Sequence, residues 1–250
     1  MPEPMNIRKN IPNFLTLCNL ASGVVSVTLV MRGDLVWAAL FIYIAAVFDF
    51  LDGTAARLLD ARSELGKQLD SLADVVSFGV APGVITFMLL SAGCEGSCNI
   101  LERMHITPYF ALLIPLLSAL RLAKFNIDLR QEENFTGMPT PANAIFFASI
   151  PLVILAGERF FPLIRLEILA DFLSNTRTLA ILTILMSYLL VSDIRMFSMK
   201  FKSSGWKGNE PRYLFLGLTL VMLVLFGAGG IPLSILCYIL LSLVFQKQLS

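Results

Sequence analysis

Long uncharged runs dominate this sequence and constrain what it can fold into. They cover residues 14–31, 35–48, 75–92, 106–120, 138–157, 178–192 and 213–245. With 56% hydrophobic and only 15% charged residues, a soluble domain would lack the polar surface to cover its apolar content. A lone membrane span needs roughly 20 apolar residues, and a shorter run can belong to a helix that extends past the hydrocarbon. The runs therefore predict an all-α integral membrane protein, a polytopic helix bundle.

The last run, 213–245, is too long for one span. The stretch GAGGIP at 227–232 predicts a break, because glycine permits a tight turn and proline cannot continue a helix. We therefore expect eight membrane helices, of which the last two form a C-terminal hairpin. No small-residue cleavage site follows the run at 14–31, so we expect this run to stay as the first helix.

The distribution of the 19 Lys and Arg residues predicts the orientation. If the N-terminus lies inside, most of them fall on the cytoplasmic side, as the positive-inside rule requires. The segment 49–74 then faces the cytoplasm, in the plasma or inner membrane. The net charge of +1 gives no indication of a nucleic-acid partner.

The four cysteines show no metal-binding spacing. Cys18 and Cys237 lie in apolar runs, where packing as buried thiols is expected. Cys94 and Cys98 share a predicted outside loop, where they form either a disulfide or two free thiols.

Two pairs of aspartates flank a polar turn in the segment 49–74. Asp49 and Asp52 are three residues apart, and Asp70 and Asp74 are four apart, so each pair shares one face of its own helix. The stretch ARSELG between the pairs predicts a helical hairpin, in which Gly66 lets the chain bend or another backbone approach. The hairpin would bring four carboxylates together.

Four carboxylates in partly desolvated surroundings repel one another unless they take up protons or bind cations. Oxygen ligands without His or Cys favour hard ions, Mg²⁺ or Mn²⁺, and four carboxylates suffice for two of them. Two other interpretations stay open. In one, the aspartates form a solvated loop that pairs with Arg57, Arg62 and Lys67; in the other, they line an intramembrane ion pathway.

The segment also carries a family signature. The pattern Asp49-x2-Asp52-Gly53-x2-Ala56-Arg57-x8-Gly66-x3-Asp70-x3-Asp74 resembles that of the CDP-alcohol phosphotransferases at every fixed position. The resemblance implies a six-helix membrane core, a homodimer, and transfer from a CDP-linked donor to an alcohol with release of CMP. It implies that Asp49, Asp52 and Asp70 bind the metals and that Asp74 is the catalytic carboxylate at the second metal.

Four further stretches narrow the resemblance to the membrane-embedded phosphatidylserine synthases of this family. They are IPNFLTLCNLASG at 11–23, DSLADVVSFGVAP at 70–82, SALRLAKFN at 118–126 and FTGMPTPANA at 135–144. The implied donor is CDP-diacylglycerol, the implied acceptor L-serine and the implied product phosphatidylserine. Residues 1–200 would form the CDP-alcohol phosphotransferase domain, and 201–250 a cytoplasmic connector and the C-terminal hairpin.

Candidates for binding the donor lie on the first two helices and the turn. Gly53, Ala56 and Gly66 allow close approach of a cytosine or phosphate, or they pack helix against helix. Arg57 can reach a phosphate, or it pairs with Asp60 or Asp49. Asn13, Thr16 and Asn19 recur on one face of the first helix, where they either contact the nucleotide or form interhelical hydrogen bonds.

Candidates for binding serine lie at the end of the fourth predicted helix and at the start of the next. The cytoplasmic end of the fourth helix carries Arg121, Lys124 and Asn126, and a guanidinium can bind the serine carboxylate bidentately, although topology alone would explain two cations. Thr140 and Asn143 open the next helix and are candidates to orient the acceptor. Asp74 is our candidate to accept the hydroxyl proton of serine.

Two rival functions stay open at this point. A phosphorylated acceptor, such as glycerol 3-phosphate or inositol phosphate, would call for a denser basic cluster than Arg121 and Lys124. A cation transporter would use the aspartates as an ion path. Release of CMP by the purified protein separates an enzyme from a transporter.

Overall fold

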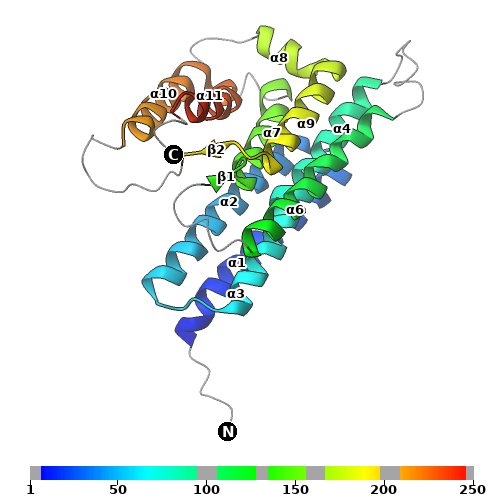
Figure 1. The fold of residues 1–250 in the computed structure, drawn as a ribbon. Coiled ribbons are helices and arrows are strands. Elements are labelled where there is room, and N and C mark those ends of the chain that lie inside the picture. Colours follow the sequence, from blue (N-terminus) through cyan, green and yellow to red (C-terminus); the bar gives the residue numbers. More distant parts are fainter. Residues whose placement is uncertain (1–6, 95–105, 128–134, 156–166, 198–208, 246–250) are drawn as a thin grey trace.

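The structure, a computed structural model, describes residues 7–94, 106–127, 135–155, 167–197 and 209–245 (Figure 1). Helices make up nearly all of this part. In chain order the elements are α1 (Ile7–Met31), α2 (Leu35–Leu58), α3 (Glu64–Asp74), the π-helical segment η1 (Val75–Val80), α4 (Ala81–Cys94), the 3₁₀ segment η2 (Thr107–Leu112), α6 (Leu113–Ile127), β1 (Phe135–Thr136), α7 (Thr140–Leu155), α8 (Glu167–Ser174), α9 (Thr176–Val191), β2 (Arg195–Met196), α10 (Glu210–Phe226), η3 (Gly227–Gly229) and α11 (Gly230–Val244).

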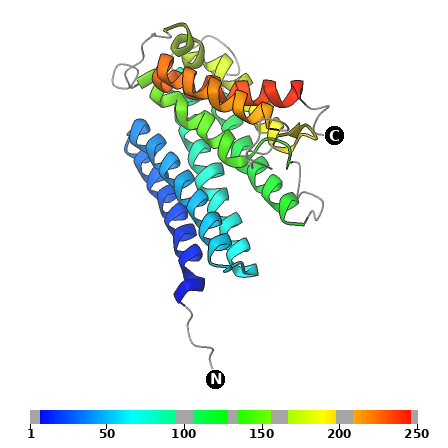
Figure 2. The same cartoon turned by 90° about the vertical axis from the view of Figure 1, so that its left-hand side faces the viewer.

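The first three helices form the part of the bundle that carries the aspartates. α1 and α2 lie side by side as an antiparallel hairpin, and α3, η1 and α4 continue beside them as one helix (Figure 1, Figure 2). The turn between α2 and α3 includes Asp60, whose φ of 47° lies in the left-handed region that Asp tolerates. Ser63 then caps α3 by accepting a hydrogen bond from the Gly66 backbone N–H at 3.0 Å. Gly66 therefore lies in the first turn of α3 and not at the bend itself.

Five helices of the described residues are long and apolar enough to cross a membrane, and α8 with α9 make a sixth if this pair, bent by 80°, counts as one span. α7 is shorter, with 16 residues. The all-α, multi-pass membrane fold predicted from the sequence is confirmed. α10 and α11 together form one apolar stretch, Glu210–Val244, and this stretch is one of the five. The number of eight membrane crossings therefore stays a prediction.

The predicted break near the C-terminus occurs at Gly227, which has a φ of 55°. The chain reverses there so closely that a Cβ on Gly230 would lie 2.3 Å from the Met222 carbonyl oxygen. α10 and α11 consequently pack against each other as a hairpin, which runs across the direction of α1 and α2 (Figure 2). α11 also contacts α7 and β2.

The distribution of side chains is that of a membrane protein. Large apolar side chains such as Phe14, Trp37 and Phe50 are more than half exposed on the outer surface. Buried hydroxyls instead bond to backbone carbonyls, as Ser26 does to Ala38 at 2.7 Å. Polar side chains thus face the interior of the bundle, which is where a functional site of a membrane protein is expected.

The strands β1 and β2 were not predicted from the sequence. They pair antiparallel, with Phe135 opposite Met196 and Thr136 opposite Arg195. The pairing ties the start of α7 to the segment that follows α9. Cys94 and Cys98, for which the sequence left a disulfide or two free thiols open, lie outside the described side chains.

Candidate active site

Three carboxylates converge where α2 meets α3. Asp49, Asp70 and Asp74 each offer an oxygen, and these oxygens all lie within 4.8 Å of one another. Asp49 belongs to the cytoplasm-directed half of α2 in the predicted topology, and the other two lie one turn apart on α3. The helical hairpin predicted from the spacing is therefore present, and it brings both pairs into one region.

Asp52 lies on the same face of α2 as Asp49 but outside the group of three. It is buried, with 6% of its surface exposed, and its Oδ2 atom has no hydrogen-bond partner in the described part of the chain. The Oδ1 atom of Asp70 is unpartnered in the same way. Buried carboxylate oxygens without donors are costly, so they fit cations that this group of aspartates would hold.

Asn19 connects α1 to this group. Its side-chain Nδ2 donates to Oδ1 of Asp74 at 3.1 Å, and its backbone carbonyl accepts a hydrogen bond from the Ser77 hydroxyl at 3.0 Å. The helices approach closely here, because a Cβ on Gly23 would lie 2.5 Å from the Ser77 Oγ atom. Of the two roles that the sequence left open for Asn19, the structure has the interhelical hydrogen bond.

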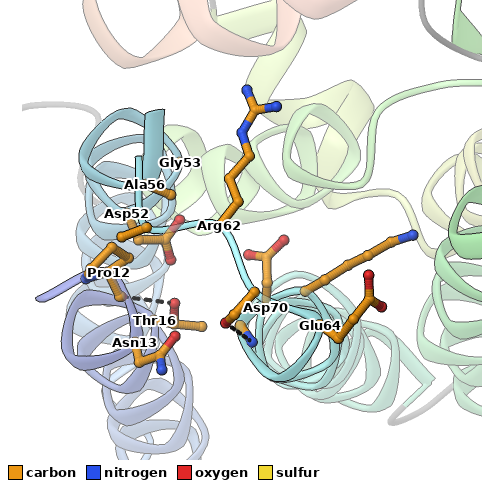
Figure 3. A pocket seen from close by; sticks show the side chains of 13 residues that line it. Pro12, Asn13, Thr16, Asp52, Gly53, Ala56, Arg62, Glu64 and Asp70 are labelled. Atoms are coloured by element: carbon orange, nitrogen blue, oxygen red, sulfur yellow. Dashed lines mark hydrogen bonds between the residues drawn. The ribbon is translucent and has the colours of Figure 1, made fainter. Parts of the chain in front are cut away.

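A cavity of about 540 Å³ opens beside the aspartates, between α1, α2 and α3. That volume is typical of sites for nucleotide-sized ligands. Asp52 and Asp70 face it from its two sides (Figure 3). It is lined by Pro12, Asn13, Thr16, Asp52, Gly53, Ala56, Ala61, Arg62, Ser63, Glu64, Gly66, Lys67 and Asp70.

Five of the seven candidates for donor binding line this cavity: Asn13, Thr16, Gly53, Ala56 and Gly66. Asn19 lies beyond it at Asp74. Arg57 does not line it; its side chain is exposed and donates to the Thr54 hydroxyl at 3.1 Å.

The two glycines of the signature have different surroundings. A Cβ on Gly53 would meet no atom within 4 Å, so this position borders open space rather than a neighbouring helix. A Cβ on Gly66 would lie 3.0 Å from the Asn13 side-chain oxygen and 3.1 Å from the Ser63 hydroxyl. Gly53 thus leaves room in the cavity, while Gly66 permits α1 to approach α3.

Sequence reasoning treated Arg62 and Lys67 only as partners for the aspartates, whereas both line the cavity. Lys67 donates from Nζ to the Asn126 carbonyl at 3.0 Å, which brings the end of α6 to α3. The Asn126 amide in turn donates to the Ser71 hydroxyl at 2.8 Å. The sequence did contain a signal for this role, because Arg62 and Lys67 follow Arg57 closely between the two pairs of aspartates.

The candidates for serine binding divide into two groups. Arg121 is buried, donates from its guanidinium to the Thr140 hydroxyl at 2.8 Å and lies within electrostatic range of Asp74. Asn143, one turn after Thr140 on α7, is fully buried, and neither of its amide atoms has a partner in the described residues. Lys124 shares a second, smaller cavity with Arg121. Asn126 instead contacts α3.

Comparison with known proteins agrees with this geometry. A family model described as CDP-alcohol phosphatidyltransferase matches residues 9–182. A CDP-diacylglycerol–serine O-phosphatidyltransferase of Bacillus subtilis is 34% identical over 189 residues, which cover 74% of this chain and 88% of the relative. One of Helicobacter pylori is 30% identical over 250 residues, 98% of this chain and 86% of the relative. An archaetidylserine synthase of Methanothermobacter thermautotrophicus is 36% identical over 145 residues, 57% of this chain and 58% of the relative.

Proposed function

This chain belongs to the CDP-alcohol phosphatidyltransferase family, and we propose that it transfers the phosphatidyl group of CDP-diacylglycerol to the hydroxyl of L-serine. The products are phosphatidylserine and CMP. The observation that carries the proposal is the convergence of Asp49, Asp70 and Asp74 beside a cavity of nucleotide size. The names of the relatives from Bacillus subtilis and Helicobacter pylori support serine as the acceptor.

The four aspartates hold two divalent cations, Mg²⁺ or Mn²⁺, in this proposal. The unpartnered oxygens of Asp52 and Asp70 support it, because a buried carboxylate oxygen needs a donor or a cation. Bound there, the ions neutralise the negative charge of the pyrophosphate, which otherwise repels an incoming nucleophile. Asp49 completes the ligand set with Asp70 and Asp74.

The donor occupies the cavity between the first three helices. Gly53 and Ala56 leave space for the cytidine and pyrophosphate, and Asn13 and Thr16 supply polar contacts from α1. Arg57 contacts the donor only if its exposed side chain turns from Thr54 toward the cavity mouth. Arg62 and Lys67 add positive charge along the same wall.

In the reaction, the serine hydroxyl oxygen forms a bond to the phosphorus that bears the diacylglycerol. The bond from that phosphorus to the oxygen of CMP breaks, and CMP leaves with the bonding electrons. Asp74 accepts the hydroxyl proton, and the Asn19 amide holds its carboxylate in place. Arg121, fixed by Thr140, binds the serine carboxylate, while Lys124, Asn126 and Asn143 complete the acceptor side.

The site lies at the cytoplasmic side of the membrane in this proposal, since the positive-inside rule puts the turn between α2 and α3 there. Both CMP and serine are then exchanged with the cytosol. Residues 1–200 form the catalytic domain and 201–250 the connector and hairpin. The enzyme works as a homodimer, as the family resemblance implies.

An acceptor panel tests the proposal. CMP release from CDP-diacylglycerol is measured for the purified protein with L-serine, serinol, glycerol 3-phosphate or inositol phosphate, and again for Arg121→Ala. We expect serine to be preferred and Arg121→Ala to raise its KM by about ten- to a hundredfold, because charge-assisted hydrogen bonds are worth about 1.5–3 kcal/mol. Serinol lacks the carboxylate, so it should be a poor acceptor for the parent protein, and Arg121→Ala should change its turnover little. Preference for a phosphorylated alcohol would instead make Arg121 and Lys124 a phosphate site.

A further inference from the structure

A second cavity, of about 50 Å³, lies between the ends of α6 and α9. Arg121, Lys124 and Phe125 line it from α6, and residues 190–193 line it from the end of α9. Such a volume holds about three to five waters, at roughly 10–15 Å³ for each. It is about a tenth of the volume of the donor cavity, which suits a small acceptor better than a nucleotide.

The charged side chains around this cavity come from two elements and differ in sign. Arg121 and Lys124 make the α6 wall positive, and Asp193 makes the α9 wall negative. Within the described part of the chain, no ion pair joins Asp193 to either cation, and the Nε atom of Arg121 is buried without a partner. α9 ends at Val191, which lines the same wall, and the C-terminal end of a helix favours a cation.

The backbone on both sides of Asp193 is held against the start of α7. Gly137 donates to the Ile194 carbonyl at 2.9 Å, and Met138 donates to the Leu189 carbonyl at 2.8 Å. Gly137 has a φ of 76°, and a Cβ there would lie 2.5 Å from the Leu190 carbonyl oxygen. The backbone on both sides of Asp193 is therefore held close to the helix whose first residue, Thr140, holds Arg121, while the Asp193 side chain itself is exposed.

Building on the proposed function, we infer that this cavity binds the acceptor as a zwitterion, with Asp193 and the end of α9 on its ammonium group and Arg121 on its carboxylate. Two unpaired walls of opposite sign suit a molecule that carries both charges at one carbon. Asp193 then selects an amino acid over a hydroxy acid of the same length. The serine hydroxyl is left to point toward Asp74, which lies in electrostatic range of Arg121.

The test compares Asp193→Asn with Asp193→Glu in the purified full chain. L-serine and 3-hydroxypropionate, which has the hydroxyl and carboxylate of serine but no ammonium, are each measured for KM as acceptors or for inhibition of serine turnover. We expect Asp193→Asn to raise the KM for serine by about ten- to a hundredfold and to leave kcat and the KM for CDP-diacylglycerol nearly unchanged. Asp193→Asn should not weaken the binding of 3-hydroxypropionate. Asp193→Glu keeps the negative charge and should recover part of the affinity for serine.

Asp171→Asn is the matched control, because Asp171 is an exposed aspartate on α8 outside both cavities. It should leave the KM for serine unchanged. The inference is overturned if Asp193→Asn keeps the KM for serine within about twofold of the parent value. It is also overturned if Asp193→Asn weakens the binding of serine and of 3-hydroxypropionate equally. Failure of the proposed function shows separately, since the parent protein would then release no serine-dependent CMP.

Discussion

Asn19 on the first helix donates a hydrogen bond to Asp74, which lies 55 residues later in the chain, across 3.1 Å. Both side chains are buried. The contact joins the helix that lines the donor cavity to the carboxylate that we propose as the proton acceptor. Its loss should therefore affect the chemical step more than the binding of either substrate.

We predict that Asn19→Ala lowers kcat by about tenfold or more, because a hydrogen bond to a charged group is worth about 1.5–3 kcal/mol. Ser22→Ala is the matched control on the same helix, since within the described residues the Ser22 hydroxyl bonds locally, to the Cys18 carbonyl at 2.8 Å. Initial rates of CMP release give kcat and both KM values. An unchanged kcat in Asn19→Ala would remove Asn19 from the mechanism.

The four aspartates should be individually required. Asp49→Asn, Asp52→Asn, Asp70→Asn and Asp74→Asn should each lower turnover by at least about a hundredfold, since metal binding contributes several kcal/mol to such a reaction. The proteins should still insert into the membrane, because the apolar helices are unchanged. Asp60→Asn is the control: Asp60 is exposed in the adjacent turn, and Asn tolerates its left-handed backbone. Near-normal CMP release by an Asp49, Asp52 or Asp70 variant would falsify the shared metal site.

Removal of divalent ions should abolish activity. After treatment with a chelator, Mg²⁺ or Mn²⁺ should restore CMP release, whereas Zn²⁺ should restore it poorly because it prefers nitrogen and sulfur ligands. The aspartate group contains neither. Full turnover in a preparation shown to be free of metal would contradict this account.

Two glycines near the site should respond differently to alanine. Gly53→Ala should raise the KM for CDP-diacylglycerol without loss of thermal stability, because the added Cβ meets no protein atom but enters the donor cavity. Gly23→Ala should lower the stability by about 1–3 kcal/mol, because its Cβ would lie 2.7 Å from the Ser77 Cα atom. Thermal unfolding in detergent and the KM for the donor separate the two effects. Equal destabilisation would show that Gly53 serves packing.

Local patterns in the sequence predicted the helices and the aspartate hairpin well. Each of the first six uncharged runs lies largely in one helical segment, and the last run forms the two helices α10 and α11. α2 continues past its run to carry Asp49 and Asp52, as a helix that leaves the hydrocarbon can. The break at Gly227 follows from the conformational freedom of glycine. These features depend on residues close together in the chain.

Contacts between distant segments were not predictable in the same way. In lipid, apolar side chains give little information about which helices meet, so the pairing of Asn19 with Asp74 and of Arg121 with Thr140 emerged only from the packed bundle. The same holds for Asp193, which an unpredicted pair of strands holds beside the start of α7. The sharp bend between α8 and α9 also had no clear signal.

The most direct test of the central claim follows both products of a single reaction. The purified protein is incubated with CDP-diacylglycerol, labelled L-serine and Mg²⁺ or Mn²⁺, and the CMP released is compared with the label recovered in lipid. We predict one labelled phosphatidylserine for each CMP, with both lost together in Asp74→Asn. CMP without labelled lipid would mean another acceptor or hydrolysis, and absence of CMP in the presence of either ion would contradict a phosphatidyltransferase altogether.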